Sequence, residues 1–177
     1  MTIERIEPTA EEAAKIEELM QAPYPVTLGT LAKKLDMTEL EAARRLPEGI
    51  VRFVTGNVKE RFSDLWGALA DWEKTTLFVI HEGHVFEIAA KLSKGKCAQG
   101  YYNILSKDAV VGGHIAYEKI EAVCFMAMPF MGRESLSVQF FDANGKTAFS
   151  IYAGRENRQI IESVKVAFKA DREAFCA

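Results

Sequence analysis

Tyrosine and histidine side chains gather in one stretch of the sequence where they could bind a ligand. Gly100-Tyr101-Tyr102-Asn103 puts two aromatic rings on opposite faces of a predicted strand, directly after a basic loop at residues 94–96. His114 begins the next predicted strand, and residues 129–135 form a tight, apolar connection with one cation, Arg133. Each feature also has an ordinary interpretation, because Tyr101 could hydrogen-bond at a sheet edge and His114 could lie on the surface.

Motifs for other kinds of chemistry are weak or missing. His81-Glu82-Gly83-His84 brings two imidazoles and a carboxylate close together, as a zinc site would, but it falls on a predicted hairpin turn, where the two rings need not converge. The sequence has no phosphate-binding loop, no G-x-S-x-G and no H-E-x-x-H. Cys97, Cys124 and Cys176 are too scattered for a disulfide framework or a structural zinc or iron–sulfur site, and we expect each to be a small buried residue.

A DNA-binding function has one feature in its favour. Residues 27–46 resemble a helix-turn-helix that ends in Arg44-Arg45. However, Glu39 and Glu41 would face phosphates, and the 22 basic residues do not outnumber the 25 acidic ones, which gives a net charge of −3. We therefore interpret this helix pair as a structural cap and expect no nucleic-acid partner.

The hydrophobic periodicity predicts the elements that must position these residues. Helical spacing covers the first third of the chain and residues 57–72, and Asn157 is the predicted N-cap of a last helix. Period-two patterns then predict strands at residues 50–55, 75–81, 84–92, 99–105, 113–120, 122–129, 135–141 and 147–153. Short connections between them favour an antiparallel meander or a pair of sheets. The predicted fold class is α+β, with about seven to nine strands in antiparallel sheets between an N-terminal helical cap and a C-terminal helix.

The chain length and its apolar content suit one compact unit. Its 177 residues are 49% apolar, enough for a sizeable core, and we divide them into a helical cap at 1–49 and a sheet core with the last helix at 50–177. The acidic N-terminus lacks the basic and apolar regions of a signal peptide. No apolar run is long enough for a membrane helix, so we expect a cytoplasmic protein without membrane insertion.

Several unusual loop sequences resemble those of one protein family, the cytosolic haem-utilisation carriers of the HutX/ChuX family. The resemblance covers residues 25–170 in the same order and at compatible spacing. It rests on Gly95-Lys96, Gly100-Tyr101-Tyr102-Asn103, Gly113-His114-Ile115, residues 129–135, residues 151–155, Leu46-Pro47, and Trp72 before Thr75-Thr76. It implies an α+β homodimer, similar to one half of the larger HemS/ChuS proteins, that takes haem b from an inner-membrane importer to a haem-degrading enzyme. A haem-degrading activity of the chain itself is the alternative.

The resemblance also implies roles for particular residues. Tyr101 and His114 match the family's axial-ligand positions, and a phenolate is a hard anionic donor suited to ferric iron. A further histidine of some relatives corresponds to His81 or His84, and we prefer His81 because it precedes the turn. We expect the apolar wall of the haem pocket and its propionate-binding cations to include Phe86, Ile104, Phe130, Lys96 and Arg133.

Overall fold

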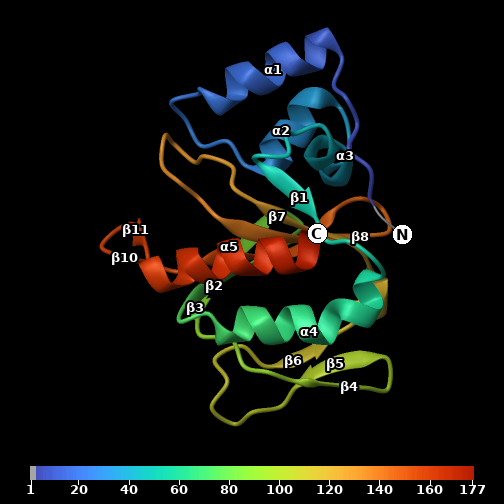
Figure 1. The fold of residues 1–177 in the computed structure, drawn as a ribbon, viewed down its shortest axis with the longest axis vertical. Coiled ribbons are helices and arrows are strands. Elements are labelled where there is room, and N and C mark those ends of the chain that lie inside the picture. Colours follow the sequence, from blue (N-terminus) through green and yellow to red (C-terminus); the bar gives the residue numbers. More distant parts are fainter. Residues whose placement is uncertain (1–2) are drawn as a thin grey trace.

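The computed structural model describes residues 3–177 and has the α+β architecture that the sequence predicts (Figure 1). The helices are α1 (Ala10–Met20), α2 (Leu28–Leu35), α3 (Glu39–Arg44), α4 (Val58–Asp71) and α5 (Glu162–Cys176), with a short 3-10 helix at Tyr117–Lys119. The strands are β1 (Val51–Phe53), β2 (Thr75–His81), β3 (His84–Ala90), β4 (Lys96–Ala98), β5 (Tyr101–Ile104), β6 (Gly113–Ile115), β7 (Ile120–Met126), β8 (Ser137–Asp142), β9 (Thr147–Ala153), β10 (Arg155–Glu156) and β11 (Gln159–Ile160).

Six strands form the main antiparallel sheet, in the order β1-β7-β8-β9-β2-β3. Strands β7, β8 and β9 are neighbours in sequence and in space, whereas β1 pairs with β7 at one edge and the β2–β3 hairpin joins β9 at the other. The hairpin turns through Glu82 and Gly83, whose φ angles of 49° and 84° are the left-handed backbone that a two-residue turn requires. A second sheet, β4-β5-β6, lies apart from the first, so the chain forms separate sheets and not one meander.

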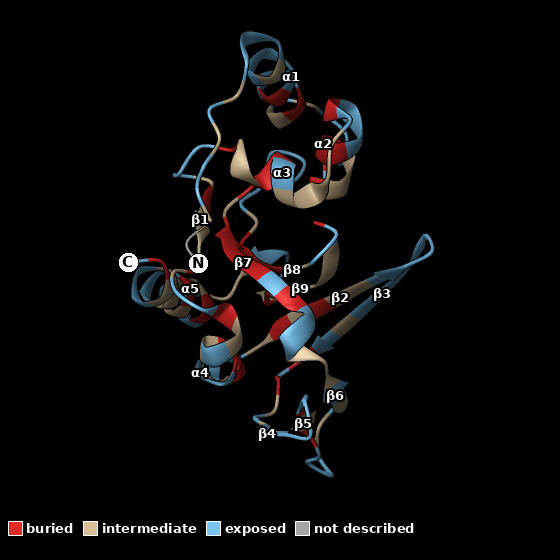
Figure 2. Ribbon diagram, turned by 90° about the vertical axis from the view of Figure 1, so that its right-hand side faces the viewer, coloured by how far each residue is buried: buried red, intermediate tan, exposed pale blue. Residues whose placement is uncertain are grey.

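Both faces of the main sheet are buried along its central strands β7 and β8, whereas most of β3 at the edge is exposed (Figure 2). Helices α1 to α3 cover one face and pack on alternate residues of β7, including Ala122 and Cys124. Helices α4 and α5 cover the other face and pack on the residues between them, Val123 and Phe125. Because both faces are covered, β7 reads as an almost continuous apolar run and not as an alternating one.

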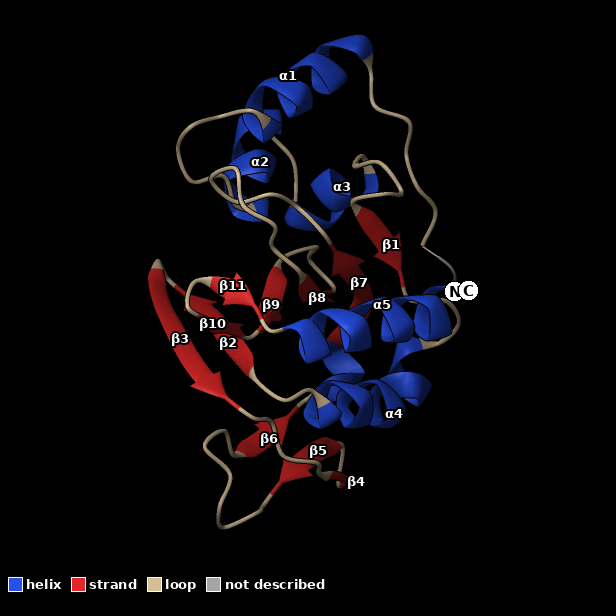
Figure 3. Ribbon diagram, turned by 60° about the vertical axis from the view of Figure 1, so that its left-hand side comes forward, coloured by secondary structure: helices blue, strands red, loops and turns tan. Residues whose placement is uncertain are grey.

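The β4–β6 sheet packs beneath α4, at the end of the molecule away from the helical cap (Figure 3). Its anchor is Tyr102, whose buried ring contacts Phe62 and Trp66 of α4 with centroids 5.5 and 5.9 Å apart. The Trp66 indole N–H also donates to the Ser93 carbonyl oxygen at 3.0 Å. One helix therefore holds the small sheet to the main core.

Two predicted strands have different boundaries in the structure. The strand expected at 99–105 spans only Tyr101–Ile104, because Gln99 and Gly100 form the turn that joins it to β4. Lys96, expected in a loop, is the first residue of β4. The strand expected at 113–120 ends after Ile115, and a 3-10 turn at Tyr117–Lys119 redirects the chain into β7. Runs of three residues carry too little periodicity to be recognised from sequence.

The predicted start of the last helix is also wrong. Asn157 and Arg158 have φ angles of 49° and 66° and form the turn between β10 and β11, while α5 begins at Glu162. Asn is favoured in both settings, because the same short side chain that caps a helix also tolerates a left-handed backbone.

The helix pair at residues 27–46 packs as a cap on the main sheet. Thr38 caps α3, with a reciprocal hydrogen bond between its backbone and the Glu41 carboxylate. The first turn of α3 lies against the β8–β9 turn, where the Leu40 N–H donates to the Gly145 carbonyl oxygen at 2.9 Å. A recognition helix presents that end to the DNA groove, whereas here it is in contact with the sheet, in agreement with the structural interpretation.

The cysteines differ from one another. Cys124 and Cys176 are buried as expected, and burial raises the pKa of the Cys176 thiol to about 11, but Cys97 is exposed on β4. The short strand β4 sits at the edge of the small sheet, which leaves its side chains uncovered. Between residues 3 and 177, none of the helices combines the length and the apolar character needed to cross a membrane.

Candidate functional site

The candidate site is the exposed face of the β4–β6 sheet. Tyr101 and Asn103 are two residues apart on β5 and share this face, while Tyr102 between them points into the core. Asn103 pairs directly with His114 of β6. Cross-strand partners lie about 5 Å apart at Cβ, so the sheet brings a phenol, an amide and an imidazole together.

Tyr101 and His114 are diagonal neighbours and not directly opposite. Their ring centroids are 6.1 Å apart with an interplanar angle of 74°, an edge-to-face contact. The Nδ1 atom of His114 lies 2.6 Å from the Oδ1 atom of Asn103. Tyr101 is 46% exposed, so a ligand can reach it from solvent.

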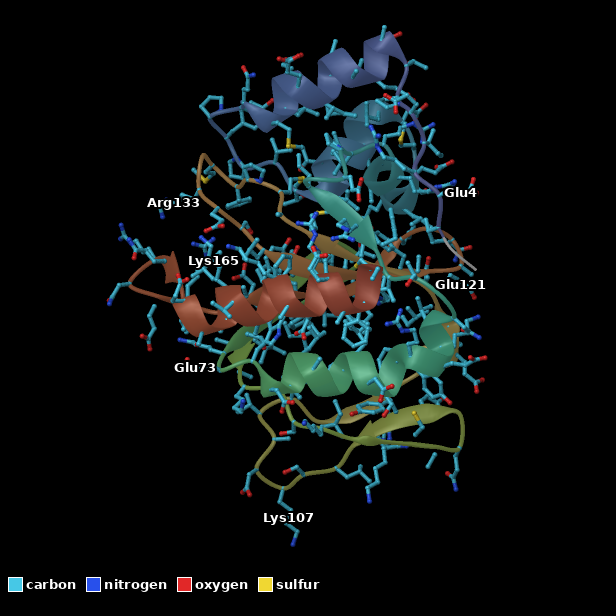
Figure 4. The ribbon with its side chains drawn as sticks, in the orientation of Figure 1. Glu4, Glu73, Lys107, Glu121, Arg133 and Lys165 are labelled. Atoms are coloured by element: carbon cyan, nitrogen blue, oxygen red, sulfur yellow. The ribbon has the colours of Figure 1, made fainter. Side chains whose placement is uncertain are left out.

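A hollow of about 700 Å³ lies beside these side chains, at the small-sheet end of the molecule, where Figure 4 marks Lys107. Its lining is Lys94, Gly95, Lys96, Ala98, Gln99, Asn103, Leu105, Ser106 and His114. Lys94 forms an ion pair with Asp71 at 2.8 Å, whereas the Lys96 ammonium has no carboxylate partner among residues 3–177. Leu105 is largely exposed and contributes an apolar surface. The hollow thus combines an imidazole, a free cation and an apolar surface, and the Tyr101 ring is in contact with the imidazole that lines it.

Tyr102 and Gly95 fix the shape of this face from below. Burial raises the pKa of Tyr102, which remains a neutral phenol and accepts a 2.7 Å hydrogen bond from the Gly95 N–H. A Cβ atom at Gly95 would overlap the Asn103 carbonyl group and would lie 2.8 Å from the Tyr102 ring. Only glycine lets the strand entering β4 approach β5 this closely.

We expect Gly95→Ala to lower the free energy of unfolding by about 1–3 kcal/mol, because the added methyl group forces β4 away from β5. Urea denaturation followed by tryptophan fluorescence measures this change. Gly112→Ala is the matched control, since its Cβ would meet its nearest atom, the Ile104 carbonyl oxygen, at 3.4 Å. Equal losses in the two variants would contradict the close-approach argument.

The hairpin residues named from the sequence lie elsewhere. His81 and His84 are direct cross-strand partners at the end of the β2–β3 hairpin, and Phe86 is exposed on the same ribbon. The two residues therefore occupy facing positions of the hairpin. The ribbon projects from the main sheet, and its tip is well separated from the β4–β6 sheet (Figures 2 and 3). Among residues 3–177, no group of three or more His, Cys, Asp and Glu side chains could hold a metal ion.

Phe130 and Arg133 lie on a third part of the surface. They pair with each other across a tight turn at Met131 and Gly132. Arg133 lines a separate, polar hollow together with Arg155, Arg158 and Lys165. Figure 4 places Arg133 on the far side of α5 from the small sheet. Within one chain, the structure therefore unites Tyr101, His114 and Lys96 but leaves Phe130 and Arg133 apart from them.

Sequence reasoning missed two residues of this face. Asn103 was visible in the Gly-Tyr-Tyr-Asn motif, and its spacing of two from Tyr101 was the available signal. Leu105 follows β5, and no local pattern distinguishes an exposed leucine at this position from a buried one. Ile104, expected in the haem wall, is buried in the core instead, since it lies on the same side of β5 as Tyr102.

Comparison with known proteins gives three independent matches. The protein family described as "Haem utilisation ChuX/HutX" matches residues 56–170. A relative from Vibrio cholerae serotype O1, named intracellular heme transport protein HutX, is 35% identical over 172 residues, which is 96% of this chain and 88% of that protein. A crystal structure of ChuX superposes with a TM-score of 0.79 at 26% identity and covers 91% of this chain and 97% of that one.

The fold also matches half of a larger protein. A crystal structure of ChuS, described as an Escherichia coli heme oxygenase, has a TM-score of 0.71 at 18% identity, and the match covers 93% of this chain but 50% of that one. This likeness confirms the predicted fold class and its relation to one ChuS half. The family match over residues 56–170 and the 35% identity to the relative from Vibrio cholerae show that the chain belongs to the ChuX/HutX family of haem-utilisation proteins.

Proposed function

We propose that this protein binds haem b on the exposed face of the β4–β6 sheet and carries it within the cytoplasm. The observation that carries the proposal is the pair formed by the exposed Tyr101 phenol and the His114 imidazole, in edge-to-face contact beside a hollow with a basic rim. The relative from Vibrio cholerae is named an intracellular heme transport protein, and a structure of ChuX is described as that of a heme binding protein.

Each part of the face suits a part of the cargo. Ferric haem supplies a hard Lewis-acidic iron, for which the Tyr101 phenolate oxygen is a suitable ligand. His114 either ligates the iron or accepts a hydrogen bond from the Tyr101 hydroxyl group, whose proton must leave when the phenolate binds iron. Lys96, with no carboxylate partner among the described residues, is free to bind a propionate, and Leu105 supplies an apolar contact for the porphyrin.

An exposed site of this kind also suits release. Tyr101 lies at the surface on a short strand, so nothing in residues 3–177 closes over it. A phenolate ligand loses affinity when the iron is reduced or the oxygen is protonated, which lets a carrier give up its haem. We therefore place a haem importer before this protein and a haem-degrading enzyme after it, and assign the carrier itself no catalytic step.

We further propose that the protein is a homodimer. The outer edge of β3 has no partner strand among residues 3–177, and three large apolar side chains on its hairpin, Ile80, Val85 and Phe86, are exposed. An unpaired edge with exposed apolar residues is a surface that proteins normally cover. His81, Phe86, Phe130 and Arg133, which one chain does not bring to Tyr101, would then take part in haem binding from a second copy.

Sedimentation at micromolar concentration is expected to give twice the 19.7 kDa mass of one chain. Val85→Lys, which adds a charge to the exposed edge strand, should shift the equilibrium toward monomer. Lys59→Arg, a conservative change on α4, is the control. A wild-type protein that stays monomeric at 100 μM would rule out the dimer.

Titration with haemin, followed through the Soret band, tests haem binding directly. We expect a saturable change with one haem per chain and no loss of the bound haem spectrum when a reductant and oxygen are supplied. A change that does not saturate would refute haem binding, and conversion to a haem-degradation product would identify an enzyme in place of a carrier.

A further inference from the structure

The side-chain amide of Asn103 has a fixed orientation. Its Nδ2 group lies within hydrogen-bond distance of three backbone carbonyl oxygens, those of Lys96 at 3.2 Å, Ala98 at 3.1 Å and Tyr101 at 3.0 Å. Rotating the amide by 180° would place its oxygen against these three acceptors, where it could accept nothing. The amide nitrogen must therefore face the carbonyls, and the amide oxygen must face the other way.

The fixed oxygen determines which nitrogen of His114 carries the proton. Oδ1 of Asn103 lies 2.6 Å from Nδ1 of His114, and an amide oxygen can only accept a hydrogen bond. Nδ1 must therefore be the donor. A neutral imidazole has one protonated and one unprotonated nitrogen, so the lone pair is left on Nε2. A neutral histidine in water prefers the opposite form, with the proton on Nε2.

We propose that Asn103 is a positioning residue that holds His114 in the Nδ1–H form, so that Nε2 is free to bind iron or to accept a hydrogen bond at the haem site. The hairpin backbone of β4 and β5 fixes Asn103, Asn103 fixes the imidazole, and the imidazole lines the hollow. Ligating histidines commonly have the second nitrogen bound to such a partner, which sets both ring orientation and tautomer. The role of Nε2 toward haem rests on the proposed function, whereas the tautomer does not.

The tautomer is measurable without haem. Long-range proton–nitrogen correlation NMR distinguishes Nδ1–H from Nε2–H rings, and the chain has only three histidines. Spectra should be recorded well above the ordinary imidazole pKa of about 6.5. We expect the Nδ1–H pattern for His114, assigned by its loss in His114→Gln, and the Nε2–H pattern for the exposed His81 and His84. An Nε2–H pattern for His114 in the wild-type protein would overturn the proposal.

Variants distinguish control of the His114 tautomer by Asn103 from a general structural role of Asn103 in the small sheet. Asn103→Ala should return His114 to the Nε2–H form, whereas Tyr101→Phe should leave the Nδ1–H form unchanged. Asn144→Ala, in the exposed β8–β9 turn beside α3 and away from the β4–β6 sheet, is the matched control. Retention of the Nδ1–H form in folded Asn103→Ala would refute the proposal. If Asn103→Ala does not fold, the tautomer of His114 in the wild-type spectrum still tests the proposal.

Haem binding then tests the functional consequence separately. Loss of a partner that orients a metal-binding histidine typically lowers affinity by about 10–100-fold, and we expect a loss of that size in Asn103→Ala and none in Asn144→Ala. If wild-type protein shows the Nδ1–H form but binds no haem, the proposed function fails and the tautomer assignment stands. If haem binds with the Nε2–H form, the function stands and this inference fails.

Discussion

Replacing Tyr101 by phenylalanine is expected to lower haem affinity by at least about tenfold, which corresponds to about 1.4 kcal/mol, and to abolish the tyrosinate-to-iron charge-transfer band. The change removes one oxygen and keeps the ring, so the edge-to-face contact with His114 survives. Because the side chain is 46% exposed, the variant should unfold at the same urea concentration as the wild-type protein. Absorption spectra and haem transfer to apomyoglobin measure the two effects.

Tyr24→Phe is the matched control, because Tyr24 is 47% exposed and lies in the helical cap, away from the small sheet. Its haem spectrum should be that of the wild-type protein. Tyr102→Phe tests the opposite face of β5, and it should cost stability by removing the acceptor of the Gly95 N–H while leaving the band in place. If the band disappears in Tyr102→Phe and survives in Tyr101→Phe, our assignment of the faces is inverted. If only His81→Ala removes the band, the iron is bound at the hairpin.

The parts of the fold that depend on local interactions could be predicted from the sequence. The capping boxes at Thr9 and Thr38 each involve residues only three positions apart, and both form as expected. Helix α4 has enough turns for its apolar spacing to identify the buried side, including Phe62 and Leu69. The hairpin at Glu82 and Gly83 was recognised because a two-residue turn between alternating runs has a definite sequence pattern.

The division of the strands among three sheets could not be predicted, because it depends on contacts between distant segments. Strand β1 joins β7, whose residues are about seventy positions away, and nothing near residue 51 indicates that partner. The three-residue strand β4 exists because Gly95 permits a close approach to β5, a contact that is invisible in the local pattern. The position of Asn157 could not be predicted from its residue type either, since asparagine suits both a helix N-cap and a turn.

The candidate site was predictable to a similar extent. The residue types and their alternation place Tyr101 and His114 near each other, because successive strands of an antiparallel sheet are usually neighbours. The positions of Phe130 and Arg133 required the tertiary structure, since they lie in the connection between β7 and β8, and Arg133 is on the far side of α5 from the small sheet. The role of Asn103 required both the strand register and three backbone carbonyl positions.

Phe62→Ala is expected to have the largest effect on stability, lowering the free energy of unfolding by about 3–5 kcal/mol. Phe62 is fully buried on α4 and contacts four other rings with centroids 5.5 to 6.1 Å away. Two of these rings belong to different sheets, Tyr102 to the small sheet and Phe140 to the main one. Truncation therefore leaves a cavity where the two sheets and the helix meet, and urea denaturation followed by tryptophan fluorescence measures the loss.

The same variant connects the core to the haem site. Since Phe62 supports Tyr102 from beneath, its loss should loosen β5 and reduce haem affinity at urea concentrations where the main sheet is still folded. Val166→Ala, on the exposed side of α5 with 59% of its surface accessible, is the control and should change stability by no more than about 0.5 kcal/mol. Phe62→Ala could instead unfold both sheets in one transition, with haem affinity unchanged at all lower urea concentrations. That result would show that the small sheet does not loosen separately from the main sheet. A loss of stability below about 1 kcal/mol would show that the aromatic cluster repacks around the cavity.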